Sequence, residues 1–227
     1  TPWLAAQQAV NPLVVVNNVL IDGTACDGDY EIPAGVTYIS PEAFFYCQTL
    51  TGITIPEGVT EIGYSAFSAC YSLARASLPE SLRIIGDEAF SGCKMMAEAN
   101  LPDGVTEMGR DAFYNCKLMP TVKIPSGLTR LEESTFSGCE AFTEIVIPAK
   151  IEYMGLNTFG GCSGMTDLTI LNPECGIAFG YKGGFVPETV TIHGYADSSA
   201  QGFANRNGNP FVVITDEPVT EQPADLD

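Results

Sequence analysis

The sequence predicts a repeat solenoid built from stacked coils of 23 residues each. A phenylalanine recurs every 23 residues, a cysteine follows each one three positions later, and a proline keeps the same period. The members of these columns are Phe44, Phe67, Phe90, Phe113, Phe136 and Phe159, then Cys47, Cys70, Cys93, Cys116, Cys139 and Cys162, then Pro33, Pro56, Pro79, Pro102, Pro125 and Pro148. Because a single coil cannot bury its own apolar side, stacking of neighbouring coils must supply the core.

Each coil is expected to contain two short parallel strands and one short helical turn. In the coil at residues 50–72, Ile53 and Ile55 alternate with a polar residue, and this period of two indicates a strand with one buried face. The proline then ends the strand, because it has no N–H to donate a hydrogen bond to the neighbouring strand. Residues 59–62 predict a second brief strand, and residues 64–69 predict a helical turn that buries the phenylalanine.

The repeat lattice divides the chain into four regions. Residues 1–29 lie before the lattice and are expected to form an N-terminal cap, and residues 30–171 form the solenoid of six coils. Residues 172–214 are expected to form a C-terminal cap, and residues 215–227 an acidic linker or tail. Caps are needed because an open end of a solenoid exposes apolar surface and unpaired strand edges.

Both caps have recognisable local signals. Residues 2–9 suggest a short helix with proline at an early position, and residues 13–21 suggest a hairpin around an Asn-Asn turn. Near the other end, Ser198 or Ser199 is suited to cap a short helix. Residues 211–214 read as a closing strand.

Cysteine usage indicates a reduced core ladder rather than a disulfide framework or a metal site. Six of the eight cysteines lie on the lattice, where successive side chains point inward in parallel, and free cysteine is among the most buried residue types. Cys26 and Cys175 lie off the lattice and are the better candidates for oxidation. No metal is expected, because there is no C-x-x-C motif and only one histidine, and Asp22, Asp27 and Asp29 lack EF-hand spacing.

The charge of the chain excludes several classes of partner. Its formal net charge is −18, with 28 acidic and 10 basic residues, so its surface repels nucleic-acid backbones and anionic lipid headgroups. No apolar run approaches the roughly 20 residues of a membrane span. The chain begins at Thr1 without a signal sequence, and we expect it to be a mature fragment of a longer protein. We also expect a monomer.

The repeat unit resembles the leucine-rich repeat of the BspA-like type. The segments LTGITIPEGVTEIGYSAFSAC and MAEANLPDGVTEMGRDAFYNC match its pattern, and the match extends over about residues 30–170. The opening segment, TPWLAAQQAVNPLVVVNNVLIDG, and the closing segment, IHGYADSSAQGFANRNGNPFVVI, are similar to those of such proteins from gut Firmicutes. Ser40 and Glu132 stand where glycine is usual, and Leu171 replaces proline, but these departures leave only the last coil in doubt.

This resemblance implies a secreted or surface-displayed bacterial protein. Relatives of this type are often multidomain and are used for adhesion to host proteins, other bacteria or polysaccharide. Some carry wall anchors or dockerin modules, and the acidic tail is suited to lead into one. The implied location is extracellular or on the bacterial cell surface.

No residue pattern indicates catalysis, and we expect neither an enzyme nor a cofactor. His193 is the only histidine, and the sequence has no nucleophile motif such as G-x-S-x-G to accompany it. The carboxylate pairs Asp87-Glu88 and Glu132-Glu133 are adjacent residues in turns, so the two members point to different sides. Glycoside hydrolysis instead needs two carboxylates that face each other across a cleft.

The exposed columns between the core columns are the candidate recognition surface. Their side chains vary from coil to coil, as expected for a graded binding face, although a merely solvated sheet face would also show variation. The candidate binding residues are Arg75, Ser77, Glu98, Asn100, Thr121, Lys123 and Glu144. A second, weaker candidate is the column Tyr38, Glu61, Ile84, Glu107, Arg130 and Tyr153, in which tyrosine is a residue type enriched at recognition surfaces.

Together these features predict a non-enzymatic extracellular binding module that recognises a protein or a polysaccharide. One alternative is a structural spacer that displays another domain of a larger surface protein. Another is a parallel β-helix enzyme such as a polysaccharide lyase. The enzyme is disfavoured because it would need acids clustered with Arg or Lys on one face, and the ten basic residues are scattered among the coils.

Overall fold

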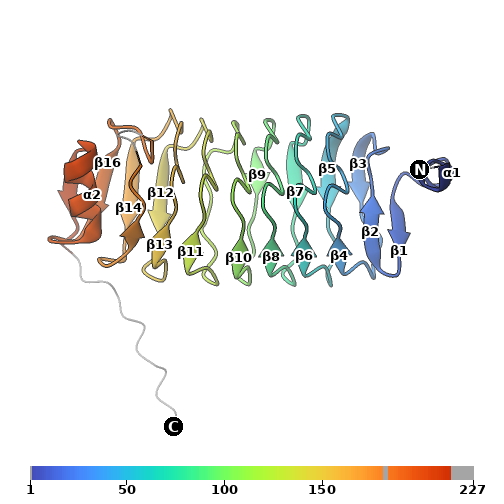
Figure 1. Cartoon of the computed structure of the whole chain (residues 1–227), viewed down its shortest axis with the longest axis horizontal. Coiled ribbons are helices and arrows are strands. Elements are labelled where there is room, and N and C mark those ends of the chain that lie inside the picture. Colours follow the sequence, from blue (N-terminus) through green and yellow to red (C-terminus); the bar gives the residue numbers. More distant parts are fainter. Residues whose placement is uncertain (1, 181–183, 216–227) are drawn as a thin grey trace, which may run out of the picture.

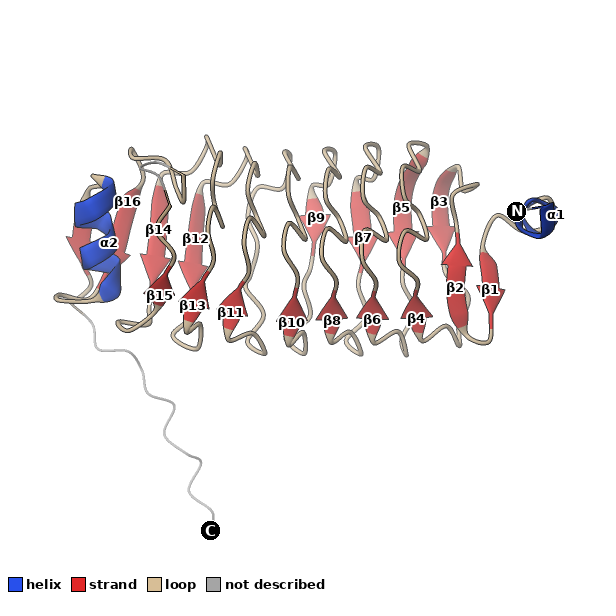
Figure 2. Cartoon of the chain, viewed as in Figure 1, coloured by secondary structure: helices blue, strands red, loops and turns tan. Residues whose placement is uncertain are grey.

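The computed structural model describes residues 2–180 and 184–215, apart from the side chain of Glu98. The described part forms one elongated solenoid, with helix α1 (Pro2–Gln8) at one end and helix α2 (Ser199–Asn207) at the other (Figure 1). A regular coil contributes strands to two faces, and turns form its third side (Figure 2). The predicted solenoid is therefore confirmed. Nearly all of the expected acidic tail lies outside the described residues.

The first face consists of parallel strands that are in register at the coil spacing. Its strands are β3 (Gly28–Glu31), β5 (Leu50–Thr54), β7 (Arg75–Ser77), β9 (Glu98–Ala99), β12 (Glu144–Ile147), β14 (Asp167–Ile170), β16 (Thr191–Gly194) and β17 (Phe211–Val213). They form two sheets, β3-β5-β7-β9 and β12-β14-β16-β17. Because β14 pairs with β16, the stack continues past Leu171.

The second face has shorter strands and is also divided in two. Its strands are β1 (Val14–Val16), β2 (Val19–Asp22), β4 (Tyr38–Ile39), β6 (Glu61–Ile62), β8 (Ile84–Ile85), β10 (Glu107–Met108), β11 (Arg130–Leu131), β13 (Tyr153–Met154) and β15 (Gly176–Ile177). The first six form one sheet and the last three another. Every pair on this face is parallel except the β1–β2 hairpin.

The third side contains successive tight turns, and the expected helical turn at residues 64–69 is wrong. Alternate N–H groups, those of Ser65, Phe67 and Ala69, donate to carbonyls of the next coil instead of bonding four residues back as in a helix. Ser65 and Ala69 also have positive φ angles, 50° and 60°, which a right-handed helix does not contain. The third side is therefore a ladder of turns between neighbouring coils.

The phenylalanine column is the centre of the core. The six rings are fully buried and stack in sequence, with neighbouring centroids 4.7 to 6.0 Å apart. At the C-terminal end, Phe159 meets Phe185 edge-on at 6.2 Å, and Phe185 meets Phe203 of α2 at 5.0 Å. Helix α2 thus closes the aromatic column.

The lattice cysteines are free, buried and hydrogen-bonded, so their role in core packing is confirmed. From the second coil to the sixth, each thiol donates to the carbonyl of a phenylalanine 26 residues earlier, as Cys93 does to Phe67 at 3.2 Å. Burial raises the pKa of Cys70 to about 12. The thiolate, which is the reactive form, is therefore scarce at neutral pH.

The expectation that Cys26 and Cys175 are the residues open to oxidation is wrong. Both side chains are buried and both thiols are free. Burial raises the pKa of Cys26 to about 12 and that of Cys175 to about 11. The hydrophobic core extends past the lattice at both ends and includes both residues, so these cysteines are shielded like those within it.

The elements expected in both terminal regions are present. In the hairpin of β1 and β2, Asn17 and Asn18 have φ angles of 49° and 64°, the conformation that a two-residue type I′ turn requires. Ser198 is the N-cap of α2, where its hydroxyl accepts a hydrogen bond from the N–H of Gln201. Gly208 ends the helix in a left-handed conformation.

Both faces are interrupted in the same part of the stack, and Pro120 explains the break in the first face. At the equivalent positions of other coils, the N–H of Ala97 donates to Ala74 at 3.0 Å and that of Thr166 to Thr143 at 2.8 Å. Proline has no N–H to donate. Within the described chain, residues 121–124 make no backbone hydrogen bond to either neighbouring coil.

Glu132 explains the break in the second face, between β10 and β11. Most other coils have glycine at this position, where the chain passes close to the preceding coil. A Cβ at Gly86 would lie 2.9 Å from the carbonyl carbon of Gly63, and one at Gly155 would lie 2.6 Å from the nitrogen of Glu133. The Cβ of Glu132 would meet the preceding regular coil in the same way, so the expectation that this departure leaves its coil regular is wrong. Ser40, the other departure, follows the irregular N-terminal segment, and its ladder remains closed.

The third side holds the stack together across this break, which we call the Phe113–Phe136 junction. The N–H of Phe113 donates to Thr135 at 2.9 Å and that of Asp111 donates to Glu133 at 3.0 Å. The rings of Phe113 and Phe136 remain stacked at 5.7 Å. The coils therefore stay in contact through their turns and core, while both strand ladders are open.

Restoring the usual residues should close the two ladders separately. Pro120→Thr supplies the missing donor on the first face, and Glu132→Gly removes the obstructing Cβ on the second. We expect each change to slow amide hydrogen exchange about five- to tenfold on its own face, at residues 121–124 or 129–132. Each single variant is the control for the other, and exchange unchanged in both would contradict this explanation of the break.

Candidate functional site

The predicted binding residues gather around two open hollows on the first face. Arg75, Ser77 and Asn100 line a hollow of about 640 Å³ over β3, β5 and β7. Asn100 also lines a second hollow of about 600 Å³, together with Thr121 and Lys123. Five of the seven predicted residues therefore meet at adjoining concavities.

The other two predicted residues are not brought into this group. Glu144 is exposed on β12, on the other side of the interrupted sheet, and lines neither hollow. Glu98 lies in β9, which pairs with β7, but its side chain is outside the described part of the structure. The candidate site is thus concentrated on the N-terminal half of the first face.

An ion pair between Asp29 and Arg75 crosses the first hollow. Asp29 belongs to β3 and Arg75 to β7, and the two side chains meet over Gly52 of the intervening strand β5. A Cβ at Gly52 would lie 2.6 Å from Asp29 Oδ1, so glycine leaves the space that the pair occupies. Thr51 donates to the same carboxylate at 2.6 Å. Because the pair is exposed, it defines the shape of the hollow more than it adds stability.

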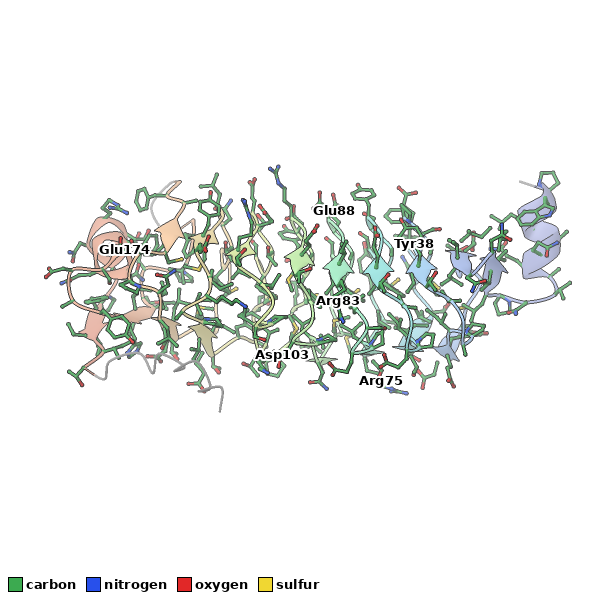
Figure 3. The ribbon with its side chains drawn as sticks, turned by 90° about the horizontal axis from the view of Figure 1, so that it is seen from below. Tyr38, Arg75, Arg83, Glu88, Asp103 and Glu174 are labelled. Carbon is green, nitrogen blue, oxygen red and sulfur yellow. The ribbon has the colours of Figure 1, made fainter. Side chains whose placement is uncertain are left out.

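Lys123 is held beside the second hollow by Asp103. Its Nζ lies 2.6 Å from Asp103 Oδ2, and the same carboxylate accepts a hydrogen bond from the N–H of Ser126 at 3.2 Å. The hydrogen bond from Lys123 is the main cause of a lowered pKa at Asp103. In Figure 3, Arg75 and Asp103 lie toward one edge of the molecule, and Glu88 lies toward the opposite edge.

His193 belongs to a separate polar contact farther along the same face. Its Nε2 lies 2.7 Å from Asp167 Oδ1, so β16 and β14 are joined by their side chains as well as their backbones. This hydrogen bond is the main cause of a lowered pKa at Asp167. The histidine lines neither first-face hollow.

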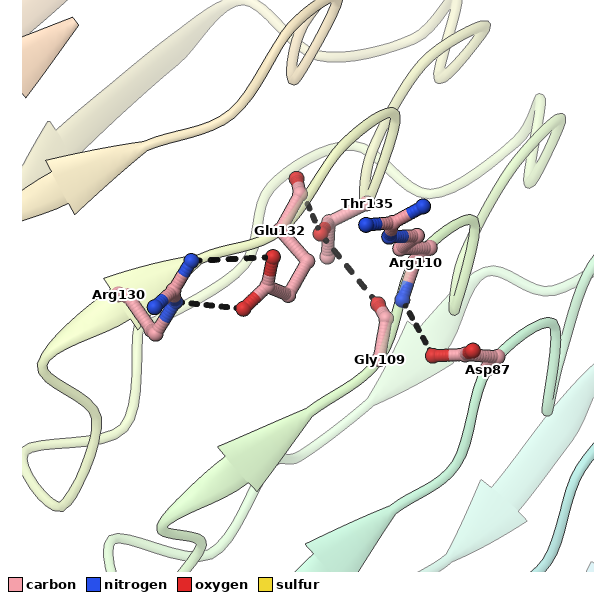
Figure 4. Close-up of polar contacts among 6 residues, drawn as sticks. All are labelled: Asp87, Gly109, Arg110, Arg130, Glu132 and Thr135. Atoms are coloured by element: carbon pink, nitrogen blue, oxygen red, sulfur yellow. Dashed lines mark hydrogen bonds and ion pairs between the residues drawn. The ribbon is translucent and has the colours of Figure 1, made fainter. Parts of the chain in front are cut away.

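The second face has its own hollow, of about 630 Å³, at the opening between β10 and β11. Figure 4 shows Arg130 paired with Glu132 there, and the backbone N–H of Arg110 donating to Asp87 at 2.8 Å. Arg130 also lies over the ring of Tyr153, 5.2 Å from its centroid. The second, weaker candidate column contributes Ile84, Glu107 and Arg130 to this hollow, but the sequence analysis did not foresee that the strand ladder opens here. The sequence feature that could have revealed the opening is Glu132, which stands where most coils have glycine.

Two of the three aspartates near the N-terminal end of the solenoid, Asp22 and Asp29, are engaged in internal contacts. Asp22 accepts hydrogen bonds from the N–H of Thr24 at 2.9 Å and from its hydroxyl at 2.8 Å, and Asp29 pairs with Arg75. Among the described residues, no group of three or more His, Cys, Asp or Glu side chains is placed to hold a metal ion. Neither described helix is long and apolar enough to cross a membrane.

These features define a leucine-rich repeat solenoid with a polar, hollowed strand face. The family model of the BspA type leucine-rich repeat region, which contains six copies, matches residues 28–140 and 60–175. The chain belongs to this family. A comparison with curated proteins finds no match.

Several solved bacterial structures are similar to the chain. A leucine-rich repeat protein from Bacteroides ovatus has 24% identity and a TM-score of 0.53, over 80% of this chain and 61% of that one. The leucine-rich repeat protein of T. pallidum has 25% identity and a TM-score of 0.52, over 67% and 86%. The pneumococcal vaccine antigen PcpA has 21% identity and a TM-score of 0.51, over 87% and 44%. These likenesses support the fold, and this chain spans less than two thirds of the Bacteroides ovatus protein.

Two substitutions should shift the carboxylate pKa values independently. His193→Ala removes the hydrogen bond that favours ionised Asp167, so the pKa of Asp167 should rise toward its usual value while that of Asp103 stays unchanged. Lys123→Ala should do the reverse. Carboxyl ¹³C NMR titration measures both groups in each variant. The same shift at both sites in either variant would show that the pairs do not form as described.

Proposed function

We propose that this chain is a non-enzymatic binding module that recognises a protein or a polysaccharide through the first face. The observation that carries the proposal is the convergence of Arg75, Ser77, Asn100, Thr121 and Lys123 on two adjoining hollows. Solenoids of this kind use extended surfaces of repeated side chains for binding. Family membership supports the proposal, because leucine-rich repeat solenoids are typically binding scaffolds without catalytic activity.

The chemistry of the hollows suits a polar ligand of mixed charge. The face offers hydroxyl, amide, cationic and anionic groups at the regular spacing of neighbouring strands, about 4.8 Å. Arg75 and Lys123 are exposed, and among the described residues each pairs with one exposed carboxylate. A ligand carboxylate or hydroxyl can compete for such weak surface pairs. An extended ligand lying along the solenoid axis would meet equivalent positions in successive coils.

We further propose that the module acts as a monomer outside the cell or on the bacterial cell surface, where ligands of this kind are available. Residues 1–29 and 172–214 would serve as its caps, and residues 215–227 would connect it to another part of a longer protein. Proteins of the BspA type are typically surface-associated, which supports this location. The alternative function is a structural spacer that displays another domain.

Alanine substitution on the first face tests the proposal. The wild-type chain is screened against an array of bacterial and host glycans and a panel of extracellular-matrix proteins. Arg75→Ala, Asn100→Ala and Lys123→Ala should each weaken any ligand found by roughly tenfold. Lys150→Ala, which removes an exposed cation outside both candidate columns and the hollows described above, is the matched control. Binding unaffected by all three changes would rule out the first face, and no binding to either set would favour the spacer.

A further inference from the structure

A line of exposed apolar side chains runs along the third side of the N-terminal coils, away from the hollows. We call it the turn ridge. Its members are Phe45, Tyr46, Tyr71, Met95, Tyr114 and Leu118. Five of them are substantially exposed, with Tyr46 56% accessible, Met95 49% and Leu118 47%, whereas Tyr71 is half-buried. Contiguous exposed apolar surface on a soluble protein commonly marks an interaction site.

The aromatic members of the ridge contact one another and a lysine. The rings of Phe45 and Tyr46 have centroids 6.4 Å apart, and Tyr46 meets Tyr71 edge-on at 5.9 Å. The Nζ atom of Lys94 lies 4.5 Å from the centroid of Tyr71. Three coils therefore contribute to one continuous patch, which holds its rings in place before any partner binds.

The ridge stops at the Phe113–Phe136 junction, although the repeat does not. Each of the first four coils carries at least one large apolar side chain on the ridge, although small residues such as Ser68, Ala69 and Gly92 also stand in these turns. In the next two coils, the positions equivalent to Phe45, Tyr46 and Met95 are all small. These residues are Ser137, Gly138, Ala141, Gly160, Gly161 and Gly164. The same turns and the same buried phenylalanine form in both halves of the solenoid. Packing of the coil thus does not require large apolar side chains here, and the ridge needs another explanation.

The charge of the ridge also differs from that of the rest of the molecule. The chain has 28 acidic residues, yet residues 43–49, 66–73, 89–96 and 112–119 contain none. Lys94 and Lys117 are the charged residues in these segments. Lys117 pairs with Glu140 of the next coil, whereas Lys94 rests on Tyr71 and has no acidic partner in the described part of the chain. Lys94 is therefore placed to receive a carboxylate.

The residue types of the ridge fit a protein partner better than a glycan. Tyrosine, phenylalanine and methionine are enriched in the centres of protein interfaces. Met95 and Leu118 present aliphatic and thioether surface, which sugar rings do not select. Stacking of a sugar needs an open aromatic face, but Lys94 covers one face of Tyr71 and Tyr46 meets it edge-on.

We propose that the turn ridge is a protein-docking surface, distinct from the first-face hollows. Its partner presents apolar side chains together with a carboxylate that pairs with Lys94. The chain would then hold two partners at once, one on the first face and one on the third side. This proposal does not depend on the function proposed for the first face, because the two surfaces share no residue.

A selected peptide and a methionine label test the docking surface. A randomised twelve-residue peptide library is selected on the whole chain and counter-selected on a Tyr46→Ser/Tyr71→Ser variant, and the most enriched peptide is synthesised as the probe. Met95 is exposed, whereas the other five methionines are at most 4% accessible. With ¹³C-methyl methionine labelling, the peptide should therefore shift the Met95 signal and leave the other five in place.

The composition and charge of the probe decide the outcome. Enriched peptides should combine aromatic or aliphatic residues with Asp or Glu. Lys94→Glu should weaken binding at least about tenfold, whereas Lys94→Arg should retain it. Val146→Ser/Val212→Ser, which removes exposed apolar side chains from the first face, is the matched control and should bind normally. Peptides without acids, equal binding by Lys94→Glu, or a Met95 shift that depends on protein concentration alone would overturn the proposal.

Discussion

The stacked phenylalanine column, with its cysteine-to-carbonyl hydrogen bonds, is the constraint on which the rest of the structure depends. Each ring is buried between the rings of its neighbours, and each thiol from the second coil onward satisfies the carbonyl of an earlier phenylalanine. A coil of different length would shift the phenylalanine ring and the cysteine thiol together. It would then lose both the ring stacking and the thiol-to-carbonyl hydrogen bond. The period of 23 residues is therefore held constant, and variation is confined to the positions that face outward.

This constraint lets the strand faces vary without loss of the stack. At the Phe113–Phe136 junction both ladders are open, yet the turns remain hydrogen-bonded and the rings remain stacked. Pro120 and Glu132 are tolerated because the third side and the core hold the coils together. Their effect is to create concave surface, since a hollow opens beside each of them. Two of the three hollows thus lie where the repeat departs from its own pattern, whereas the hollow over β3, β5 and β7 lies on paired strands.

The lattice and the two strand columns could be predicted, because burial imposes a period of 23 residues that is visible in the order of apolar residues. The terminal elements could be predicted from local turn and capping residues. The turns of the third side could not, because their bonds to the next coil replace the local bonds of a helix. Glu132 was visible as a departure, but its consequence depends on the close approach of two backbones. Five of the seven first-face residues line the two hollows, whereas the broken sheet separates Glu144 from them and the side chain of Glu98 lies outside the described part of the structure. The turn ridge was missed because its rings, unlike core residues, have no fixed period.

The free energy of unfolding of Phe113→Ala tests the central role of the column most directly. Phe113 is fully buried, whereas its neighbour Tyr114 is 38% accessible in the same turn, so Tyr114→Ala is the matched control. Urea denaturation should show a loss of about 3–5 kcal/mol for Phe113→Ala. Tyr114→Ala should lose less than about 1 kcal/mol. Equal losses in the two variants would contradict the account, because the buried ring would then contribute no more than an exposed one.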